Sequence, residues 1–396
     1  MKNKLSDRIN NLPVSATLAM AAKARELKNN GIDIIGLSLG EPDFNTPDFI
    51  KNAAIQAVND NYNSYTPVDG YSELKQSICN KFKRDNGLNY QPSQIVVSNG
   101  AKQSIANVVQ VLVNPGDDVL LVAPYWVSYS AIVTLAEGNP IEIRSDISSD
   151  FKITPLQLEN AITKRTKLVV INSPNNPSGS IYTEKEYLAL AKVLEKYPEI
   201  YILSDEIYEH INYGIPHFSF AKITSMYNRT ITVNGVAKAF AMTGWRIGYL
   251  GAPNWIAKAC TKMQGQITSG ANCIAQRATI AALDAPVSEI QYMIDEFKER
   301  RGLIIELLGG IEGIKLNQPK GAFYIFPDIS SFFGKTLKGK KINNASEFAI
   351  YLLEEAHVAT VTGDAFGSPN NIRISYAASK EEIKKAIARI SKALAD

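Results

Sequence analysis

The chain contains only three cysteines and three histidines among its 396 residues. The cysteines are scattered and odd in number, which argues against a disulfide framework and against a paired-thiol zinc site. The histidines, His210, His217 and His357, show no metal-ligand spacing. We therefore expect no metal site, and the unpaired thiols fit a reducing cytoplasm.

The sequence also lacks a block of one charge and a long apolar run. Its 42 basic and 39 acidic residues leave a net charge of +3, without the basic cluster that marks a nucleic-acid-binding surface. No run approaches the roughly 18 apolar residues of a membrane span, and residues 1–13 lack the apolar core of a secretory signal. We expect a soluble, cytoplasmic protein that binds neither nucleic acid nor membranes.

What the sequence does contain is an alternation of β-branched runs and helical patterns, such as KLVVINS followed by TEKEYLALAKVLEKY. Strands that are apolar almost throughout are typical of parallel sheets covered on both faces, so this region is expected to be α/β. Beyond about residue 285, long helices and a few strands indicate a smaller α+β unit. Because 396 residues exceed what one core of roughly 250–300 residues supports, we predict a large domain over 46–285 and a small one from 1–45 and 286–396.

Five polar residues follow the apolar strands of the α/β region, where open sheets of this class bind their ligands. They are Asn176 in PNNPSG, Asp205 and Tyr208 in SDEIY, and Lys238 and Arg246 in KAFAMTGWRIGY. Each alone has an ordinary explanation, because the asparagine fits a turn, the aspartate a helix cap and the lysine a solvated surface. Turns and caps rarely produce all five in this order.

In that order the motifs resemble fold-type I pyridoxal-phosphate enzymes, specifically the prokaryotic-type class I aminotransferases of the aspartate aminotransferase family. The resemblance spans nearly the whole chain: PVSAT, SLGEPDF, YTPVDGYSELK, SNGAKQS, PYWVSY, NSPNNPSG, SDEIY, KAFAMTGWRIGY and NIRISYA. It implies a large domain with a mainly parallel sheet, a smaller α+β domain, and pyridoxal 5′-phosphate as the cofactor.

The resemblance also implies a set of cofactor contacts. Lys238 would form the Schiff base with the cofactor aldehyde and then carry the proton of the substrate's α-carbon. Asp205 would keep the pyridine nitrogen protonated, while Tyr208 and Asn176 would donate to the ring hydroxyl oxygen. We expect all four in the catalytic centre.

The cofactor phosphate needs a fixed cation and backbone donors at the start of a helix. Arg246 matches that cation, and the amides of Gly100, Ala101 and Lys102 open a predicted helix after the strand QIVVSNG. By the resemblance, Tyr65 reaches the phosphate of a neighbouring subunit, which implies a homodimer with shared active sites. Trp126 would lie against the cofactor ring and, with Asn176, border the substrate.

The substrate's α-carboxylate requires a bidentate partner, and Arg373 in NIRISYA matches it. Gly40 would let the backbone approach that carboxylate. Lys102, Ser15 and Thr17 resemble the subgroup in which a lysine binds a side-chain carboxylate. The resemblance thus implies an aspartate transaminase with 2-oxoglutarate as acceptor and a ping-pong mechanism.

Three positions depart from the family pattern. Ala237 and Gly235 stand where many relatives have phosphate-binding serines, and Tyr129 stands where some have a histidine near the aspartate, so different tuning of Asp205 is expected. A nicotinamide oxidoreductase would carry a G-x-G-x-x-G motif that is missing here, and a transcription regulator would need an amino-terminal DNA-binding module. Prephenate, aromatic or kynurenine aminotransferases and a lyase on the same fold remain open.

Overall fold

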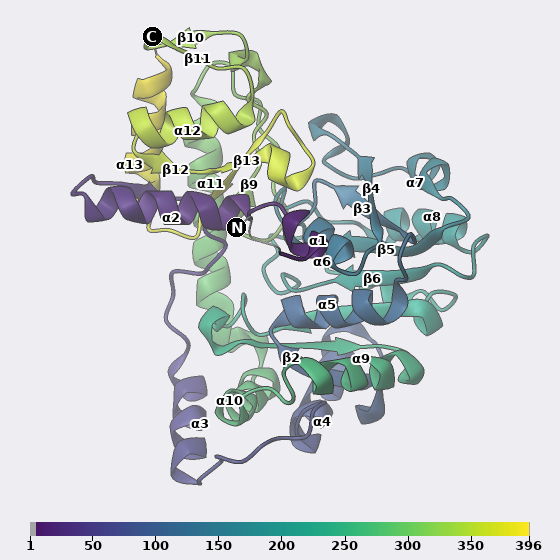
Figure 1. Cartoon of the computed structure of the whole chain (residues 1–396). Helices are drawn as coiled ribbons and strands as arrows, with labels where there is room; N and C mark the ends of the chain where they lie inside the picture. Colours follow the sequence, from purple (N-terminus) through teal and green to yellow (C-terminus); the bar gives the residue numbers. More distant parts are fainter. Residues whose placement is uncertain (1–4, 396) are drawn as a thin grey trace.

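The computed structural model describes residues 5–395, which form a seven-stranded sheet covered by helices and a second, smaller assembly of helices and short strands (Figure 1). The strand order is β2-β8-β7-β6-β5-β3-β4. Six of these strands point the same way, and β8 runs antiparallel to both of its neighbours. In chain order the strands are β2 (Ile95–Asn99), β3 (Asp118–Ala123), β4 (Asn139–Arg144), β5 (Thr166–Asn172), β6 (Tyr201–Asp205), β7 (Thr230–Gly235) and β8 (Ile247–Gly251).

The central strands are apolar throughout because both of their faces are covered. Along β3, Val119 and Leu121 belong to one core cluster, while Leu120 and Val122 belong to another, as the alternation of side chains along a strand requires. Helices α5 (Ala101–Leu112), α6 (Ser128–Leu135) and α9 (Asn254–Ile267) cover the first face. Helices α7 (Pro155–Ala161) and α8 (Glu184–Leu194) cover the second.

The largest core cluster joins the edge of the sheet to the smaller assembly. Helix α10 (Cys273–Asp284) packs against α3 (Asp48–Asn59) and α4 (Ser72–Lys81), with α4 beside β2 and α10 beside β8. Because this cluster runs through both parts of the chain, it marks no boundary between them. The predicted division at residues 45/46 and 285/286 stays a prediction.

The smaller assembly centres on a three-stranded antiparallel sheet of order β13-β14-β9. Its strands are β9 (Tyr324–Ile325), β13 (Val361–Thr362) and β14 (Ile372–Ser375), and its helices are α11 (Gln291–Gly309), α12 (Ala345–Glu355) and α13 (Lys380–Leu394). A hairpin of β10 (Thr336–Leu337) and β11 (Lys340–Lys341) completes it.

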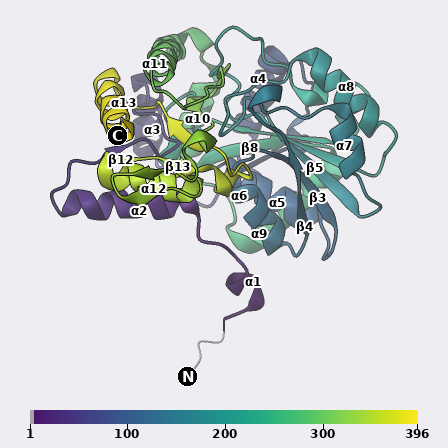
Figure 2. The ribbon, with the colours of Figure 1, turned by 90° about the horizontal axis from the view of Figure 1, so that it is seen from above.

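The amino-terminal segment packs against this carboxyl-terminal assembly. Strand β1 (Ile35–Gly36) pairs in parallel with β12 (Val358–Ala359), and α2 (Ala16–Asn29) buries Ala24 against Leu353 and Ala359. Figure 2 shows α2, α12 and α13 together on the side opposite α7 and α8. The short helix α1 (Asp7–Asn10) lies apart from this group, toward the bottom of the view. No helix within residues 5–395 is long and apolar enough to cross a membrane.

Candidate active site

Thirteen of the fourteen predicted site residues line one cavity of about 400 Å³ at the carboxyl ends of the parallel strands. The cavity lies between the large sheet and the smaller assembly, because its walls come from both. The thirteen residues are Ser15, Thr17, Gly40, Gly100, Ala101, Lys102, Trp126, Asn176, Asp205, Tyr208, Lys238, Arg246 and Arg373. The fourteenth, Tyr65, lies outside the cavity with 98% of its surface exposed.

Lys238 lies in the turn after β7, with its ammonium group inside the cavity. Its Nζ donates to the Gly40 carbonyl at 2.5 Å and lies 5.8 Å from the centre of the Tyr208 ring. Burial and the nearby Arg373 guanidinium lower the pKa of Lys238 from 10.5 to about 8. An appreciable share of the amine is therefore unprotonated at neutral pH, as a nucleophile or base requires.

Asp205 is the last residue of β6 and is buried. Burial raises its pKa from 3.8 to about 6, although two donors oppose the rise. The Tyr129 hydroxyl donates to Oδ2 at 2.5 Å, and the Ile207 amide donates to Oδ1 at 3.2 Å. Tyr129, which stands where some relatives have a histidine, thus interacts with Asp205 through a neutral hydrogen-bond donor.

Arg373 lies on β14 with only 2% of its surface exposed. One terminal nitrogen donates to the Ser38 carbonyl at 2.5 Å and the other to the Asn176 side-chain oxygen at 3.0 Å. Its Nε is buried without a hydrogen-bond partner, and no carboxylate of residues 5–395 forms an ion pair with the Arg373 guanidinium. A buried guanidinium is costly unless an anion faces it, so this position suits a carboxylate ligand.

Arg246 and the start of α5 form a second cationic corner of the cavity. Gly100 precedes the helix at φ +80°, and a Cβ there would lie 2.5 Å from a guanidinium nitrogen of Arg246. Arg246 donates to the carbonyls of Thr243 and Asn99 at 3.1 and 3.2 Å. The first amides of α5, at Ala101 and Lys102, have no acceptor within the helix and can bind an anion.

The outer wall of the cavity contains Lys102 and the beginning of α2. The Lys102 ammonium lies 5.0 Å from the centre of the Trp126 ring, and burial together with Arg246 lowers the pKa of this lysine. Ser15 precedes α2, and the Thr17 hydroxyl oxygen is buried without a hydrogen-bond partner. This wall therefore offers one cation and free hydroxyl groups to a ligand.

Two cavity residues that were not predicted from the sequence form hydrogen bonds with predicted site residues. Asn172, the last residue of β5, donates to the Asp205 carbonyl at 2.9 Å and accepts from the Asn176 amide at 2.8 Å. Tyr324, on β9, shares a hydrogen bond of 2.8 Å with Tyr208. Strand-end position was a usable signal for Asn172, whereas Tyr324 lies within the apolar run GAFYIF and has no such signal.

A buried ionic network lies behind the turn that carries Asp205 and Tyr208. Glu206 and Glu209 of the same turn contact Asn86 instead of lining the cavity, and Lys81 from α4 forms an ion pair with Glu209. Burial opposes ionisation of Glu209, but the Lys81 charge prevails and lowers the pKa of this carboxyl to about 2.

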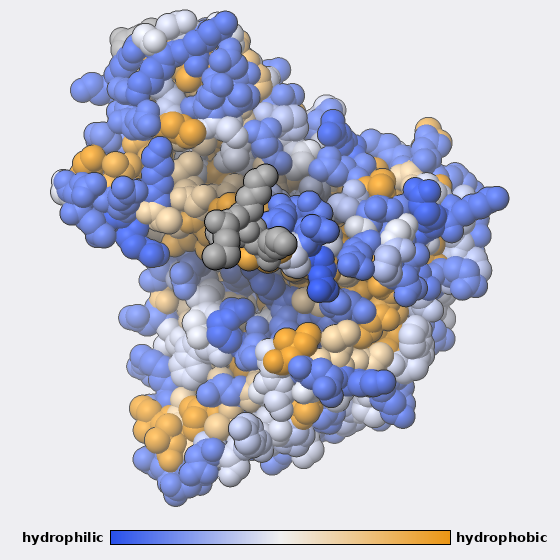
Figure 3. Space-filling model, in the orientation of Figure 1, coloured by the Kyte–Doolittle hydropathy of each residue, from blue (hydrophilic) through white to orange (hydrophobic). Residues whose placement is uncertain are grey.

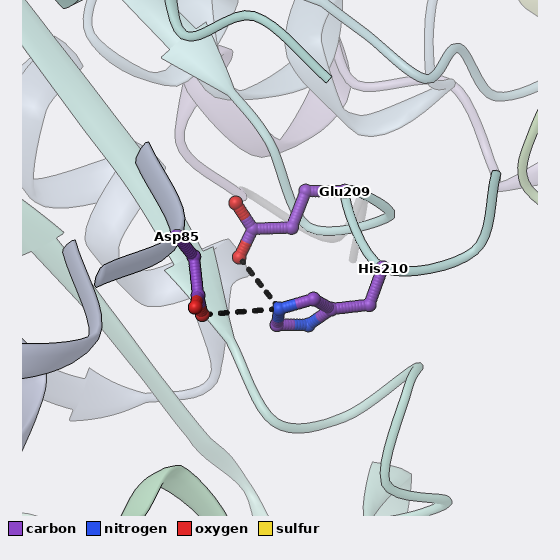
Figure 4. A group of neighbouring side chains, drawn as sticks. All are labelled: Asp85, Glu209 and His210. Atoms are coloured by element: carbon purple, nitrogen blue, oxygen red, sulfur yellow. Dashed lines mark hydrogen bonds and ion pairs between the residues drawn. The ribbon is translucent and has the colours of Figure 1, made fainter. Parts of the chain in front are cut away.

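Two of the histidines, to which the sequence gave no role, belong to this network. His210 contacts Asp85 and Glu209 (Figure 4), at 3.3 and 3.7 Å. His217 contacts Glu206 at 2.8 Å, and this carboxylate raises the pKa of the imidazole against the effect of burial. The Lys81 ammonium supplies a cation to this network.

Known proteins resemble the chain along its full length. Residues 32–390 match the family described as aminotransferase class I and II. A bifunctional aspartate aminotransferase and glutamate/aspartate-prephenate aminotransferase of Petunia hybrida is 46% identical over 395 residues, covering 98% of this chain and 82% of the relative. An aspartate/prephenate aminotransferase of Cereibacter sphaeroides is 46% identical over 389 residues, covering 98% and 97%.

Two solved structures show the same fold. The aspartate aminotransferase of Rhizobium meliloti superposes with a TM-score of 0.96 at 43% identity, over 99% of each chain. The Thermus thermophilus aspartate aminotransferase with maleate superposes with a TM-score of 0.92 at 39% identity, over 99% of this chain and 100% of that one.

Proposed function

This chain belongs to the class I and II aminotransferases, and from that membership we propose that it transfers the α-amino group of L-aspartate to 2-oxoglutarate with pyridoxal 5′-phosphate as cofactor. The observation that carries the proposal is the single cavity that holds a lysine amine, a buried aspartate and a buried, anion-free arginine. These three groups are what amine exchange on an α-amino acid requires.

The residues present fit this cofactor. Arg246 and the first amides of α5 would hold its phosphate, and we call this group the phosphate cradle. The Arg246 guanidinium packs directly against Gly100, at the start of that helix. Asp205 would face the ring nitrogen, since a cationic N–H there would offset the burial that raises its pKa. Bound in this cradle, the cofactor supplies an aldehyde that condenses with amines and a ring that withdraws electrons from the α-carbon.

Lys238 moves the proton in this proposal. Its amine has a pKa of about 8, so it can take a proton from the substrate's α-carbon and deliver it to a neighbouring atom. The Gly40 carbonyl keeps Nζ inside the cavity. Tyr208 and Asn176 are donors that can stabilise negative charge on a ligand oxygen beside this amine.

Arg373 binds the α-carboxylate of the substrate. Two of its nitrogens already donate to Asn176 and Ser38, and the carboxylate would add the counter-charge that the guanidinium now lacks. Every amino-acid substrate has this carboxylate, so Arg373 fixes the reacting end without selecting the side chain.

Lys102 selects the side chain in this proposal. Its ammonium and the hydroxyl groups of Ser15 and Thr17 suit the distal carboxylate of aspartate or 2-oxoglutarate. Prephenate is a second candidate acceptor, because two of the relatives carry it in their names and Trp126 gives the cavity an aromatic wall.

A homodimer also belongs to the proposal. Tyr65 is almost fully exposed, and apolar side chains gather over α3 (Figure 3), among them Ile55 and Val58 with more than half of their surface exposed. A second copy placed on this face would bury them, and Tyr65 would then meet the partner's phosphate cradle. The location we propose for the enzyme is the cytoplasm, which suits its free cysteines.

The test is incubation of the purified, cofactor-loaded protein with aspartate and 2-oxoglutarate. We expect glutamate and oxaloacetate in equal amounts. Either substrate alone should give no more than one equivalent of product per active site, because only one half-reaction can then occur. Release of pyruvate or ammonia without glutamate would assign the chain to a lyase instead.

A further inference from the structure

We propose that Tyr324 is a positioning residue of the active site: its hydroxyl donates to the Tyr208 oxygen, so that the hydrogen of Tyr208 points into the cavity. This inference rests on the proposed function, because Tyr208 would then donate to the ring oxygen of the cofactor. It adds a residue from the smaller assembly to the groups that tune the cofactor.

The contact between the two tyrosines crosses from one part of the protein to the other. Tyr208 follows β6 of the large sheet, and Tyr324 lies on β9 of the small one. Their hydroxyl oxygens are 2.8 Å apart, and their rings meet edge to face with centroids 5.8 Å apart. Both side chains are buried, with Tyr208 at 3% and Tyr324 at 0% exposure.

Two further contacts hold the Tyr324 ring in place. The Arg373 guanidinium lies 4.6 Å from its centroid, within the range of a cation–π interaction. Strand pairing supports this arrangement, because β14, which carries Arg373, is hydrogen-bonded to β9 with Ser375 opposite Tyr324. On the other side, Gly40 packs so closely that a Cβ there would overlap the Tyr324 hydroxyl group. The hydroxyl therefore has little freedom except toward Tyr208.

The direction of the hydrogen bond follows from what Tyr208 must do. A hydroxyl has one hydrogen to donate and can accept through its oxygen. If Tyr208 donates into the cavity, it can only accept from Tyr324, and accepting a bond strengthens its own donation. Without Tyr324, Tyr208 loses that polarisation and the partner that fixes its orientation.

The test compares Tyr324→Phe with Tyr376→Phe, both in the cofactor-loaded protein. Tyr376 is a matched control, because it too is fully buried and donates to the Ala322 carbonyl at 3.2 Å, yet it does not line the cavity. The readout is the pH midpoint of the visible absorbance of the bound cofactor. A donor at the ring oxygen favours the form in which the adjoining Lys238 nitrogen has lost its proton, since the oxygen then keeps its whole negative charge.

We expect Tyr324→Phe to raise this midpoint by about half a pH unit or more, while Tyr376→Phe leaves it within about 0.2 units of the wild type. Tyr208→Phe should raise the midpoint further, and adding Tyr324→Phe to it should change nothing more, because the effect passes through the Tyr208 hydroxyl. Thermal unfolding of all four variants shows whether the fold is intact.

The proposal is overturned if Tyr324→Phe titrates like the wild type, or if its shift persists undiminished in the Tyr208→Phe background. A wild-type protein that binds no pyridoxal phosphate at all would instead refute the proposed function. A wild-type midpoint that Tyr324→Phe fails to move refutes only the role of Tyr324.

Discussion

Replacing Lys81 by methionine should destabilise the protein strongly, because it removes the cation of the ion pair behind the active-site turn. The Lys81 and Glu209 side chains are only 1% and 3% exposed, so water cannot solvate the carboxylate that is left. Methionine keeps the length and apolar stem of lysine. The loss therefore reports mainly on the charge.

The magnitude follows from the burial of the pair. The pKa of Glu209 falls from 4.5 to about 2 although burial opposes its ionisation, because the Lys81 charge, with His210 and His217, outweighs the cost of desolvation. Removing one partner of a buried pair typically costs about 3–5 kcal/mol. We expect Lys81→Met to lose about that much, or roughly 5 °C in unfolding temperature if the chain unfolds as one unit with an unfolding entropy of about 2 cal/mol/K per residue.

Differential scanning calorimetry against a control on the same helix measures this loss. Lys75 pairs with Asp69 at 2.5 Å in a more exposed setting, so Lys75→Met should cost about 1 kcal/mol or less. Lys81→Met/Glu209→Gln should recover part of the loss, because glutamine can still accept from Asn86. The reasoning is refuted if the two lysine variants lose equally, or if the double variant is less stable than Lys81→Met.

The pH dependence adds a check of sign. A carboxyl with a depressed pKa stabilises the folded state above its unfolded pKa, near 4.5, and that stability is lost as the pH falls toward 2. In Lys81→Met this contribution is missing at every pH. The difference in unfolding free energy between the wild type and Lys81→Met should therefore decrease as the pH falls from 5 to about 2.

The remaining predictions concern the cavity. Lys238→Ala should lower transamination by at least about 10²-fold while the cofactor still binds, so activity within about tenfold of the wild type would contradict its role as base. Tyr129→Phe removes a donor to Asp205, raises that pKa further and should weaken cofactor binding about tenfold by equilibrium titration, whereas unchanged affinity would show that the contact is unimportant. Lys102→Ala should raise the KM for aspartate by about tenfold or more and that for phenylalanine by less than about threefold, and equal changes would remove Lys102 from side-chain recognition. Arg373→Lys should raise the KM of every amino acid by about tenfold or more, because lysine cannot reproduce a bidentate contact, and a change limited to dicarboxylates would contradict this assignment.

The α/β character of the fold could be predicted because short apolar runs alternate along the sequence with segments of helical periodicity. A strand contains an uninterrupted apolar run such as LVVI, over residues 168–171, when both faces of the sheet are covered. Strand β8 was not predicted, because its five residues include two glycines and follow Arg246 without a turn signal. Gly248 is required there for contact rather than for the strand, since a Cβ would overlap the backbone that opens α5.

The members of the site could be predicted by motif, whereas their mutual contacts could not. The sequence predicted that Arg373 and Asn176 belong to one site, but their hydrogen bond joins residues 197 positions apart. The network around Glu206 and Glu209 gave no signal at all, because charged residues after a strand usually face solvent. Its partners Lys81 and Asn86 come from a different helical segment, which only the tertiary fold brings near.

The residues that line the cavity come from separate stretches of chain, and part of the outer wall comes from the amino-terminal segment. Lys238, Asp205 and the start of α5 lie at the ends of strands of the large sheet. Ser15 and Thr17 instead come from an amino-terminal segment that packs against the smaller assembly. Substitutions in that segment can therefore change which substrate side chain fits while leaving Lys238 and Asp205 in place. Changes of substrate range should therefore involve residues 15–18 as well as Lys102.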